Sequence, residues 1–382
     1  MRPTKRRQSE ALLAWTLVVS GCASSPGLGI TSDASATACG ECHTSEFAAW
    51  STSRLASSGT SPVFEALAAN VATAWGEPAR ARCVTCHQPG FGGDHGIGCV
   101  SCHSATGNLA TRDGLLTVDL GVPISGPFSD PASTPAHGSR EYALLESPDL
   151  CGTCHEVTGP GLLAETTLDE FNASGLADGG TSCATCHMPE IAPGAVSVGQ
   201  TNTRTRSDHS FVGVDPPWGA SPAEQTAAAS RTLMLLRMGL ALGATTSGDG
   251  QALDVTVTNQ AGHAIPTGAT YLRGVWVDVD LTGADGAASP VPSVITLDSQ
   301  PMLEGQPVAL LTQADSVDSS ELAAGGTISV RVPYPAGLTS PVTAVVTLRA
   351  RAVRADVLDA LGLGDSGAEV PTHEVAVVRV PE

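Results

Sequence analysis

The chain has 382 residues, enough for two or three domains, and a formal net charge of −19. Loss of residues 1–21 would leave 15 Lys and Arg against 37 Asp and Glu, a net charge of −22. Because nucleic-acid phosphates would repel so acidic a surface, the composition argues against a nucleic-acid partner and favours cationic partners or simple solubility.

The N-terminus has the pattern of an export signal. A basic head precedes the apolar run 11–19, which is too short to span a bilayer. The run ends in VVSGCAS, which resembles the lipobox of bacterial lipoproteins, so we expect residues 1–21 to be removed and Cys22 to carry lipid. The alternative is cleavage after the ASA at 34–36. Residues 22–36 are small and predict a flexible tether.

The next segment, 37–221, holds ten of the eleven cysteines but has weak apolar periodicity. It is rich in Gly, Pro, Ser and Thr, and it predicts short helices only, for example over 61–75 and 140–145. A segment of this kind buries too little apolar surface to offset its chain entropy. A bound group must therefore supply part of its core.

The ten cysteines fall into five CxxCH motifs, the signature of covalent c-type haem attachment. The two thiols of a motif form thioethers with the haem, and the adjacent imidazole becomes the proximal iron ligand. Zinc half-sites and redox dithiols do not require a histidine directly after each pair. The motifs predict five covalently bound haem c groups, attached at Cys39, Cys42, Cys83, Cys86, Cys99, Cys102, Cys151, Cys154, Cys183 and Cys186, with proximal ligands His43, His87, His103, His155 and His187.

Five histidines lie outside the motifs, as many as there are predicted irons. We take them as candidate distal ligands: His95, His137, His209, His263 and His373. The alternatives are a surface-loop residue for His95, a turn residue bonded to backbone for His263 and a strand-end residue for His373. If all five bind iron, every predicted haem has two imidazoles and no coordination position for a substrate.

The rest of the chain predicts a helix and then strands. Residues 222–243 read as one core-packing helix with a stripe of leucine and methionine, within a connecting segment 222–247. From Gly248 the apolar period changes to two, and Pro and Gly turns separate the runs. Residues 248–382 therefore predict a β-sandwich of about seven strands, similar in style to the immunoglobulin fold. The expected fold is multidomain: an irregular, mostly short-helical pentahaem domain, a helix and a C-terminal β-sandwich.

Several longer stretches resemble multihaem cytochromes related to the tetrahaem cytochrome of ammonia oxidisers. They are CVTCHQPG…GIGCVSCH, AHGSREYALLESPDLCGTCHE, TLDEFNASGLADGGTSCATCHMPE and DHSF; VTVTNQAGHAIPTGATYLRGVWVDV, with its GHxxPTG-type motif, resembles a β-domain that often follows such haem domains. The resemblance covers residues 37–285, although this chain has five motifs where the family has four. It implies close-packed haems used for electron transfer, and it supports His137, His209 and His263 as distal ligands.

These features favour an electron-transfer protein over a catalyst. We expect an exported pentahaem cytochrome, anchored by lipid to a membrane beyond the inner membrane, on the periplasmic side or at the outer membrane or cell surface, that relays electrons between redox partner proteins. One alternative is an oxidoreductase in which a haem without a distal histidine acts on a small nitrogen or sulfur compound. Another is a subunit of an outer-membrane cytochrome assembly, in which the β-domain docks onto a conduit or onto neighbouring copies as an oligomer.

Overall fold

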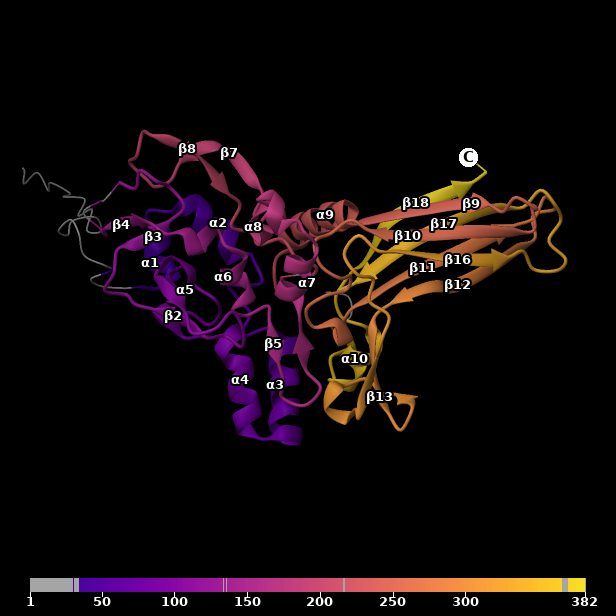
Figure 1. Ribbon diagram of the computed structural model, residues 1–382, viewed down its shortest axis with the longest axis horizontal. Helices are drawn as coiled ribbons and strands as arrows, with labels where there is room; N and C mark the ends of the chain where they lie inside the picture. The colour runs from indigo at the N-terminus through magenta and orange to yellow at the C-terminus, as the bar shows by residue number, and fades with distance from the viewer. Residues whose placement is uncertain are drawn as a thin grey trace, which may run out of the picture.

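The computed structural model describes Ile30, 34–132, Thr134, 136–215, 217–365 and 370–381. The expected signal peptide and Cys22 lie outside the described residues. The molecule is elongated, with short helices at one end and long strands at the other (Figure 1). None of the helices in the described part of the chain is both long enough and apolar enough to cross a membrane.

The first part, up to residue 215, consists of short helices joined by small sheets. Its α-helices are α1 (Ala36–Gly40), α2 (Thr44–Ser51), α3 (Pro62–Trp75), α4 (Glu77–His87), α5 (Cys99–His103), α6 (Pro148–Gly152), α7 (Thr167–Ala173) and α8 (Cys183–His187). Its two-stranded sheets are β1 (Ala105–Asn108) with β2 (Leu116–Val118), β3 (Ile124–Gly126) with β4 (Ser139–Glu141), β5 (Val157–Thr158) with β6 (Ala164–Glu165), and β7 (Glu190–Ala195) with β8 (Thr203–Ser207). Three 3₁₀ turns complete it: η1 (Phe91–Gly93), η2 (Ala143–Glu146) and η3 (Ala177–Gly179).

One of the two helices expected here forms and the other does not. The helix expected over 61–75 is α3, which begins with Pro62 in its first turn and is capped by Ser61, whose hydroxyl accepts from the Phe64 N–H. The segment 140–145 is instead strand β4 followed by the turn η2. Tyr142 is extended there, and its N–H donates to the Gly126 carbonyl over 3.0 Å, so pairing with β3 takes the backbone away from a helix.

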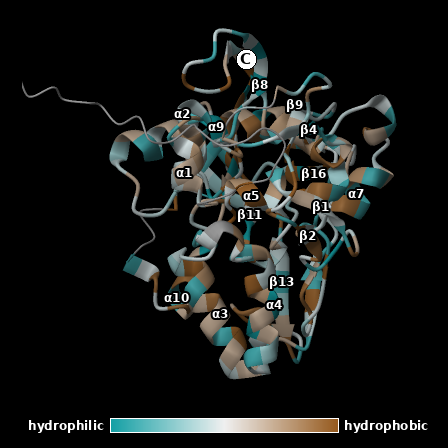
Figure 2. Cartoon of the chain, turned by 90° about the vertical axis from the view of Figure 1, so that its left-hand side faces the viewer, coloured by the Kyte–Doolittle hydropathy of each residue, from teal (hydrophilic) through white to brown (hydrophobic). Residues whose placement is uncertain are grey.

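Apolar burial in this part is thin. Its buried apolar residues are scattered and include several alanines, and its short helices are of mixed hydropathy (Figure 2). The two contiguous buried clusters of the described chain lie mainly in the second part. This distribution agrees with the expectation that a bound group supplies the core of residues 37–221.

The long helix α9 (Pro222–Gly239) connects the two parts. A capping box starts it, in which Ser221 and Glu224 bond each other's backbone N–H groups. The helix ends at Gly239, four residues before the expected end, because Leu240 begins strand β9 (Leu240–Thr246). Leu240 pairs with Asn259 in the sheet, so 240–246 belong to the β-domain rather than to the helix.

The second part contains seven long strands in two antiparallel sheets. One sheet has the order β16–β10–β9 and the other β12–β11–β17–β18. Both sheets contribute to one buried cluster, which includes Val255, Val257, Val277, Val346 and Leu348, all fully buried. The two sheets therefore pack face to face around a common core. The further strands are β10 (Ala252–Asn259), β11 (Gly274–Thr282), β12 (Ala288–Leu297), β16 (Thr327–Pro333), β17 (Thr343–Arg351) and β18 (Thr372–Val380).

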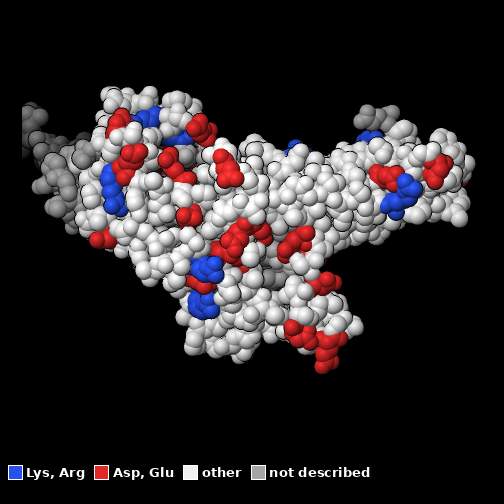
Figure 3. All heavy atoms as spheres, viewed as in Figure 1, with Lys and Arg blue, Asp and Glu red and all other residues white. Residues whose placement is uncertain are grey.

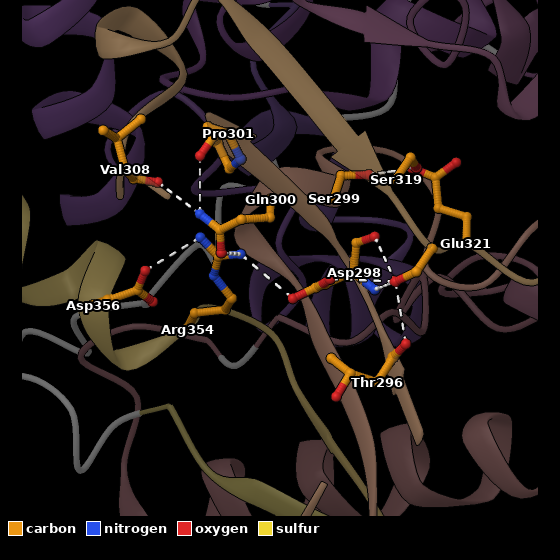
Figure 4. Close-up of polar contacts among 11 residues, drawn as sticks. Thr296, Asp298, Ser299, Gln300, Pro301, Val308, Ser319, Glu321, Arg354 and Asp356 are labelled. Atoms are coloured by element: carbon orange, nitrogen blue, oxygen red, sulfur yellow. Dashed lines mark hydrogen bonds and ion pairs between the residues drawn. The ribbon is translucent and has the colours of Figure 1, made fainter. Parts of the chain in front are cut away.

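An insertion between β12 and β16 forms a lower lobe that the sequence did not predict. Arg354 holds this lobe to the helix α10: it donates to the Gln300 side chain over 3.0 Å and forms ion pairs with Asp298 and Asp356 (Figure 4). A second buried cluster joins the lobe to Val63 of α3. The lobe thus connects the β-domain to the first part of the chain. Its elements are β13 (Ser299–Leu303), β14 (Gln306–Pro307), η5 (Leu311–Gln313) and β15 (Ser316–Ser319). The helix α10 (Ala355–Ala360), which lies between β17 and β18 in the chain, and the turn η4 (Thr270–Leu272) pack beside it.

Candidate haem-binding sites

Each CxxCH motif coincides with about one turn of helix. In the first motif the His43 N–H donates to the Cys39 carbonyl over 2.9 Å, and in the fourth the His155 N–H donates to the Cys151 carbonyl over 2.9 Å. The second, third and fifth motifs end α4, α5 and α8. Residues three and four apart share one face of a helix. Each motif can therefore present two thiols and one imidazole to the same side of one flat group.

The five motifs form a branched network of neighbours. Pairs of thiols from different motifs lie within hydrogen-bonding reach, namely Cys39 with Cys99, Cys86 with Cys154, and Cys151 with Cys183. Cys102 of the third motif lies close enough to Cys151 and Cys154 to interact with them electrostatically. The fourth motif thus adjoins the second, third and fifth, and the first motif adjoins the third.

Three motif histidines face a histidine from elsewhere in the chain. The ring centroids are separated by 6.1 Å for His43 and His137, 6.2 Å for His103 and His209, and 6.3 Å for His187 and His263, with planes 16–26° apart. Two metal–imidazole bonds of about 2 Å each, plus the two ring radii, span roughly 6 Å between centroids. Each pair therefore has the separation that one metal ion between two imidazoles requires.

The hydrogen bonds of these six rings leave the same nitrogen free. Every Nδ1 lies 2.6–3.0 Å from a backbone carbonyl oxygen: Val196 for His43, Gly138 for His137, Ser125 for His103, Ser207 for His209, Val212 for His187 and Ala264 for His263. Because a carbonyl only accepts, Nδ1 carries the proton and donates. Nε2 is then the unprotonated nitrogen in each ring, which is the arrangement typical of metal-binding histidines.

Burial keeps three of the motif imidazoles neutral. It lowers the pKa of His103 to about 4, and it also lowers the pKa values of His87 and His187. A metal binds the neutral ring, because the protonated ring has no free lone pair. These three histidines are therefore in the ligand form near pH 7.

His87 has a different neighbour. Its Nδ1 lies 3.3 Å from the Ser58 carbonyl oxygen, and the ring of Phe64 from α3 stacks on it with centroids 4.2 Å apart and planes 15° apart. Among the described residues, no second histidine faces His87 as His137 faces His43. Phe64 thus packs against the second-motif histidine, and the iron predicted there has no histidine partner on the described chain.

His155 differs from the other four motif histidines in its hydrogen bond. Its Nδ1 lies 2.6 Å from Oε1 of Glu165, a carboxylate rather than a carbonyl. The charge of Glu165 raises the pKa of the metal-free ring to about 8, against the effect of burial. No other histidine of the described chain faces His155 either.

The two remaining candidate distal ligands are not brought to a motif histidine within the described residues. His95 is exposed; its backbone packs against Gly59, beside the Ser58 that bonds His87. His373 is 8% exposed, and it pairs with Ala350 in the four-stranded sheet of the β-domain. The assignment of these two as iron ligands stays a prediction.

The residues fit the predicted haem groups in a further respect. The side chain of His155 is 59% exposed, so its ring is accessible to a group attached at the fourth motif. Nearby, Arg54 has a buried Nη1 without a protein partner among the described residues, and Ser101, inside the third motif, has a buried hydroxyl in the same situation. A haem propionate is the kind of anion that such a guanidinium binds.

Sequence reasoning did not find Glu165 or Phe64. Glu165 lies ten residues after His155, among other acidic residues of the same stretch, such as Glu156 and Glu170, and nothing in its spacing sets it apart. Phe64 is one apolar residue of an amphipathic helix, where packing is the ordinary expectation. Both positions depend on tertiary contacts between segments that no local pattern records.

Comparison with known proteins shows a similar fold in one solved structure. No family model matches the chain, and no curated protein matches it. Among solved structures it is similar to the penta-heme cytochrome c552 from Thermochromatium tepidum, with a TM-score of 0.67 and 18% identity over 91% of this chain and 98% of that one. A match to the archaeal flagellum of Methanospirillum hungatei strain JF1, with a TM-score of 0.17 and 15% identity over 33% and 67% of the two chains, carries no argument. The first likeness covers both the short-helical part and the β-domain, so the two proteins share their multidomain fold.

Proposed function

We propose that this protein is an exported pentahaem c-type cytochrome that relays electrons between redox partner proteins. Five haem c groups on the five CxxCH motifs would each supply one-electron exchange between ferric and ferrous iron. The observation that carries the proposal is the set of three histidine pairs at 6.1–6.3 Å, each with both Nδ1 atoms bonded to carbonyls. The similar Thermochromatium tepidum protein, a penta-heme cytochrome c552, supports the same count.

The contacts between motifs support a relay rather than isolated sites. The thiols of the first and third motifs lie within hydrogen-bonding reach, and Cys102 of the third motif lies near Cys154 of the fourth, so groups attached to these motifs would be close neighbours along this path. From the fourth motif, one arm leads to the second and another to the fifth. Each histidine pair would bind one iron between its two imidazoles, and an iron held in this way would exchange electrons with little rearrangement of its ligands.

The relay is tested in the haem-loaded protein. Mass spectrometry and the pyridine haemochrome assay should give five haems per chain. Stopped-flow mixing of the reduced protein with a basic soluble cytochrome should then reoxidise all five. Fewer than five haems, or a fraction that the acceptor never oxidises although it is reducible by dithionite, would contradict the relay.

Charge supports a basic partner. Acidic side chains are spread over both parts of the molecule on the face shown in Figure 3, where basic side chains occur in a few isolated groups. Complementary charge accelerates encounter, and salt screens it. The rate of reoxidation by the basic cytochrome should therefore fall as ionic strength rises, whereas an acidic acceptor should show the opposite trend.

A second candidate function has its own observation. His87 and His155 face no histidine among the described residues, which favours an oxidoreductase that binds a small nitrogen or sulfur compound at one of these irons. Carbon monoxide binds ferrous haem only where a coordination position is open or weakly held. This candidate predicts that carbon monoxide binds one or two of the five haems. If no haem binds carbon monoxide, the oxidoreductase is excluded and the relay is the remaining candidate.

We also propose a lipid anchor, which the sequence supports, and an immunoglobulin-like β-domain, which the order of its strands supports. Lipid on Cys22 would anchor the protein to a membrane beyond the inner membrane, with the β-domain free to dock onto a partner or a second copy. The strand orders β9–β10–β16 and β12–β11–β17–β18 support the immunoglobulin-like reading of that domain. Cell fractionation tests the anchor: Cys22→Ala should move the protein from the membrane to the soluble fraction, and an unchanged distribution would contradict it.

A further inference from the structure

The five motif histidines share one feature with a single exception. Each has an oxygen acceptor beside Nδ1, which fixes the ring and the tautomer. For four of them the acceptor is a neutral backbone carbonyl, of Ser58, Val196, Ser125 or Val212. For His155 it is the carboxylate of Glu165, at 2.6 Å. The fourth motif alone therefore has a negatively charged group on its proximal ligand.

Glu165 is held in this position. Its side chain is 16% exposed, and Thr167 donates to the same Oε1 over 3.5 Å. Arg273 lies close enough to interact electrostatically with Glu165. The guanidinium of Arg273 is already paired with Asp215 at 2.7 and 3.1 Å, so its charge is not available to neutralise that of Glu165.

The contact between His155 and Glu165 lies at the motif that adjoins three others, so it can affect electron transfer among all of them. The fourth motif is the branch point, with thiol contacts to Cys86 and Cys183 and with Cys102 nearby. An anionic acceptor makes an imidazole more basic, and a more basic ligand stabilises ferric over ferrous iron. Reduction of that iron adds one electron from a neighbouring haem, and no covalent bond forms or breaks.

We infer that Glu165 is a positioning residue that sets the iron bound by His155 to the lowest reduction potential of the five. The inference rests on the proposed function, because it needs the five groups in place. Electrons then reside on the arms at equilibrium and pass through the branch point without accumulating there. The ligand is thus tuned by a residue that belongs to no haem motif.

The test is potentiometric titration of the haem-loaded full chain, followed by absorption and electron paramagnetic resonance. Glu165→Gln keeps the size and an oxygen acceptor but removes the charge. It should change the reduction equilibrium constant of the haem with the lowest potential by at least tenfold. For one electron this is a rise of about 59 mV in the reduction potential. The other four components should stay in place.

Glu321→Gln is the matched control. Glu321 lines the same cavity as Glu165, of about 170 Å³, but bonds Ser299 rather than a histidine. Its replacement removes the same charge and should shift none of the five reduction potentials by as much as a tenfold change in the equilibrium constant requires. An unchanged lowest component in Glu165→Gln, or an equal shift in both variants, would overturn the inference.

Loss of haem has a separate outcome. If Glu165→Gln loads only four haems, Glu165→Asp is titrated in the same way; it keeps the charge but is one methylene shorter. Because the charge remains, the lowest potential should rise by less than the shift that corresponds to a tenfold change in the reduction equilibrium, and a larger rise would overturn the inference. Five haems in every variant with no shifted component leaves the relay intact, whereas fewer than five in the wild type overturns the proposed function itself.

Discussion

Replacement of His137 tests a distal ligand most directly. His137 faces His43 at 6.1 Å and donates its Nδ1–H to Gly138, so its Nε2 is available to iron. His137→Ala removes that ligand and should convert one low-spin haem to high-spin, about one-fifth of the total. The integrated high-spin ferric signal in electron paramagnetic resonance measures this fraction.

His95→Ala serves as the comparison. The ring of His95 is exposed and has no ring partner among the described residues, so its loss should leave the high-spin fraction unchanged. An increase in His95→Ala instead would show that His95 binds iron, as the count of histidines first predicted. An unchanged spectrum in His137→Ala would remove the strongest of the three pairs from the argument.

At the scale of single residues, the sequence was informative where covalent chemistry fixes spacing. A haem-attaching turn needs its two cysteines and its histidine at fixed offsets, so Cys39, Cys42 and His43 are found by pattern alone. A distal histidine needs only to arrive from anywhere in the fold. The count of histidines alone made His137, His209 and His95 equal candidates; the family resemblance supported His137 and His209, and tertiary contacts now separate these two from His95.

Among the elements, the ion pair of Asp215 and Arg273 gives a pH dependence. It joins the segment between β8 and α9 to the residue directly after η4, with contacts of 2.7 and 3.1 Å. Burial on its own raises the pKa of Asp215, but Arg273, with Arg54, outweighs burial and holds the pKa below its ordinary value of 3.8. The pair therefore stabilises the fold above pH about 4, and this contribution disappears as the pH falls through the lower folded-state pKa.

Asp215→Asn should lower the free energy of unfolding at pH 7 by on the order of 2 kcal/mol and flatten its fall toward pH 3. Urea unfolding at both pH values measures the effect. Asp254→Asn is the control, because its pair with Arg331 has similar geometry but lies at the surface. Equal effects of the two substitutions would show that the pair with Arg273 has no special role.

Elements with a strong period were predictable and the small sheets were not. Apolar and polar residues alternate in 253–259 and 342–352 because one face of β10 and of β17 is buried more deeply than the other. Strands of two or three residues, such as β5 and β6, have too few positions for any period. They form where a backbone must satisfy its hydrogen bonds between neighbouring motifs, as at 140–145, and that depends on the fold around them.

In the whole molecule, the β-domain supplies a residue to the haem part. The loop after β10 carries His263 to His187, and it docks on α7, where Glu170 accepts from the Ala264 N–H over 2.9 Å. Asn259 holds the loop from the other side by donating to the His263 carbonyl over 2.8 Å. An iron bound between these two rings would couple the two parts of the chain, although His187 and His263 are 76 positions apart.

Gly262 is the contact that permits this docking. A Cβ at this position would lie 2.8 Å from Cδ2 of the buried Phe171, so Gly262→Val should push the loop off α7 and carry His263 away from His187. About one-fifth of the haem should become high-spin. Gly248→Val, where a Cβ meets nothing within 4 Å, should leave the spectrum as in the wild type. If Gly262→Val also keeps the wild-type spectrum, the β-domain is a separate unit whose histidine does not bind iron, and the reason for its packing against the haem part must lie elsewhere.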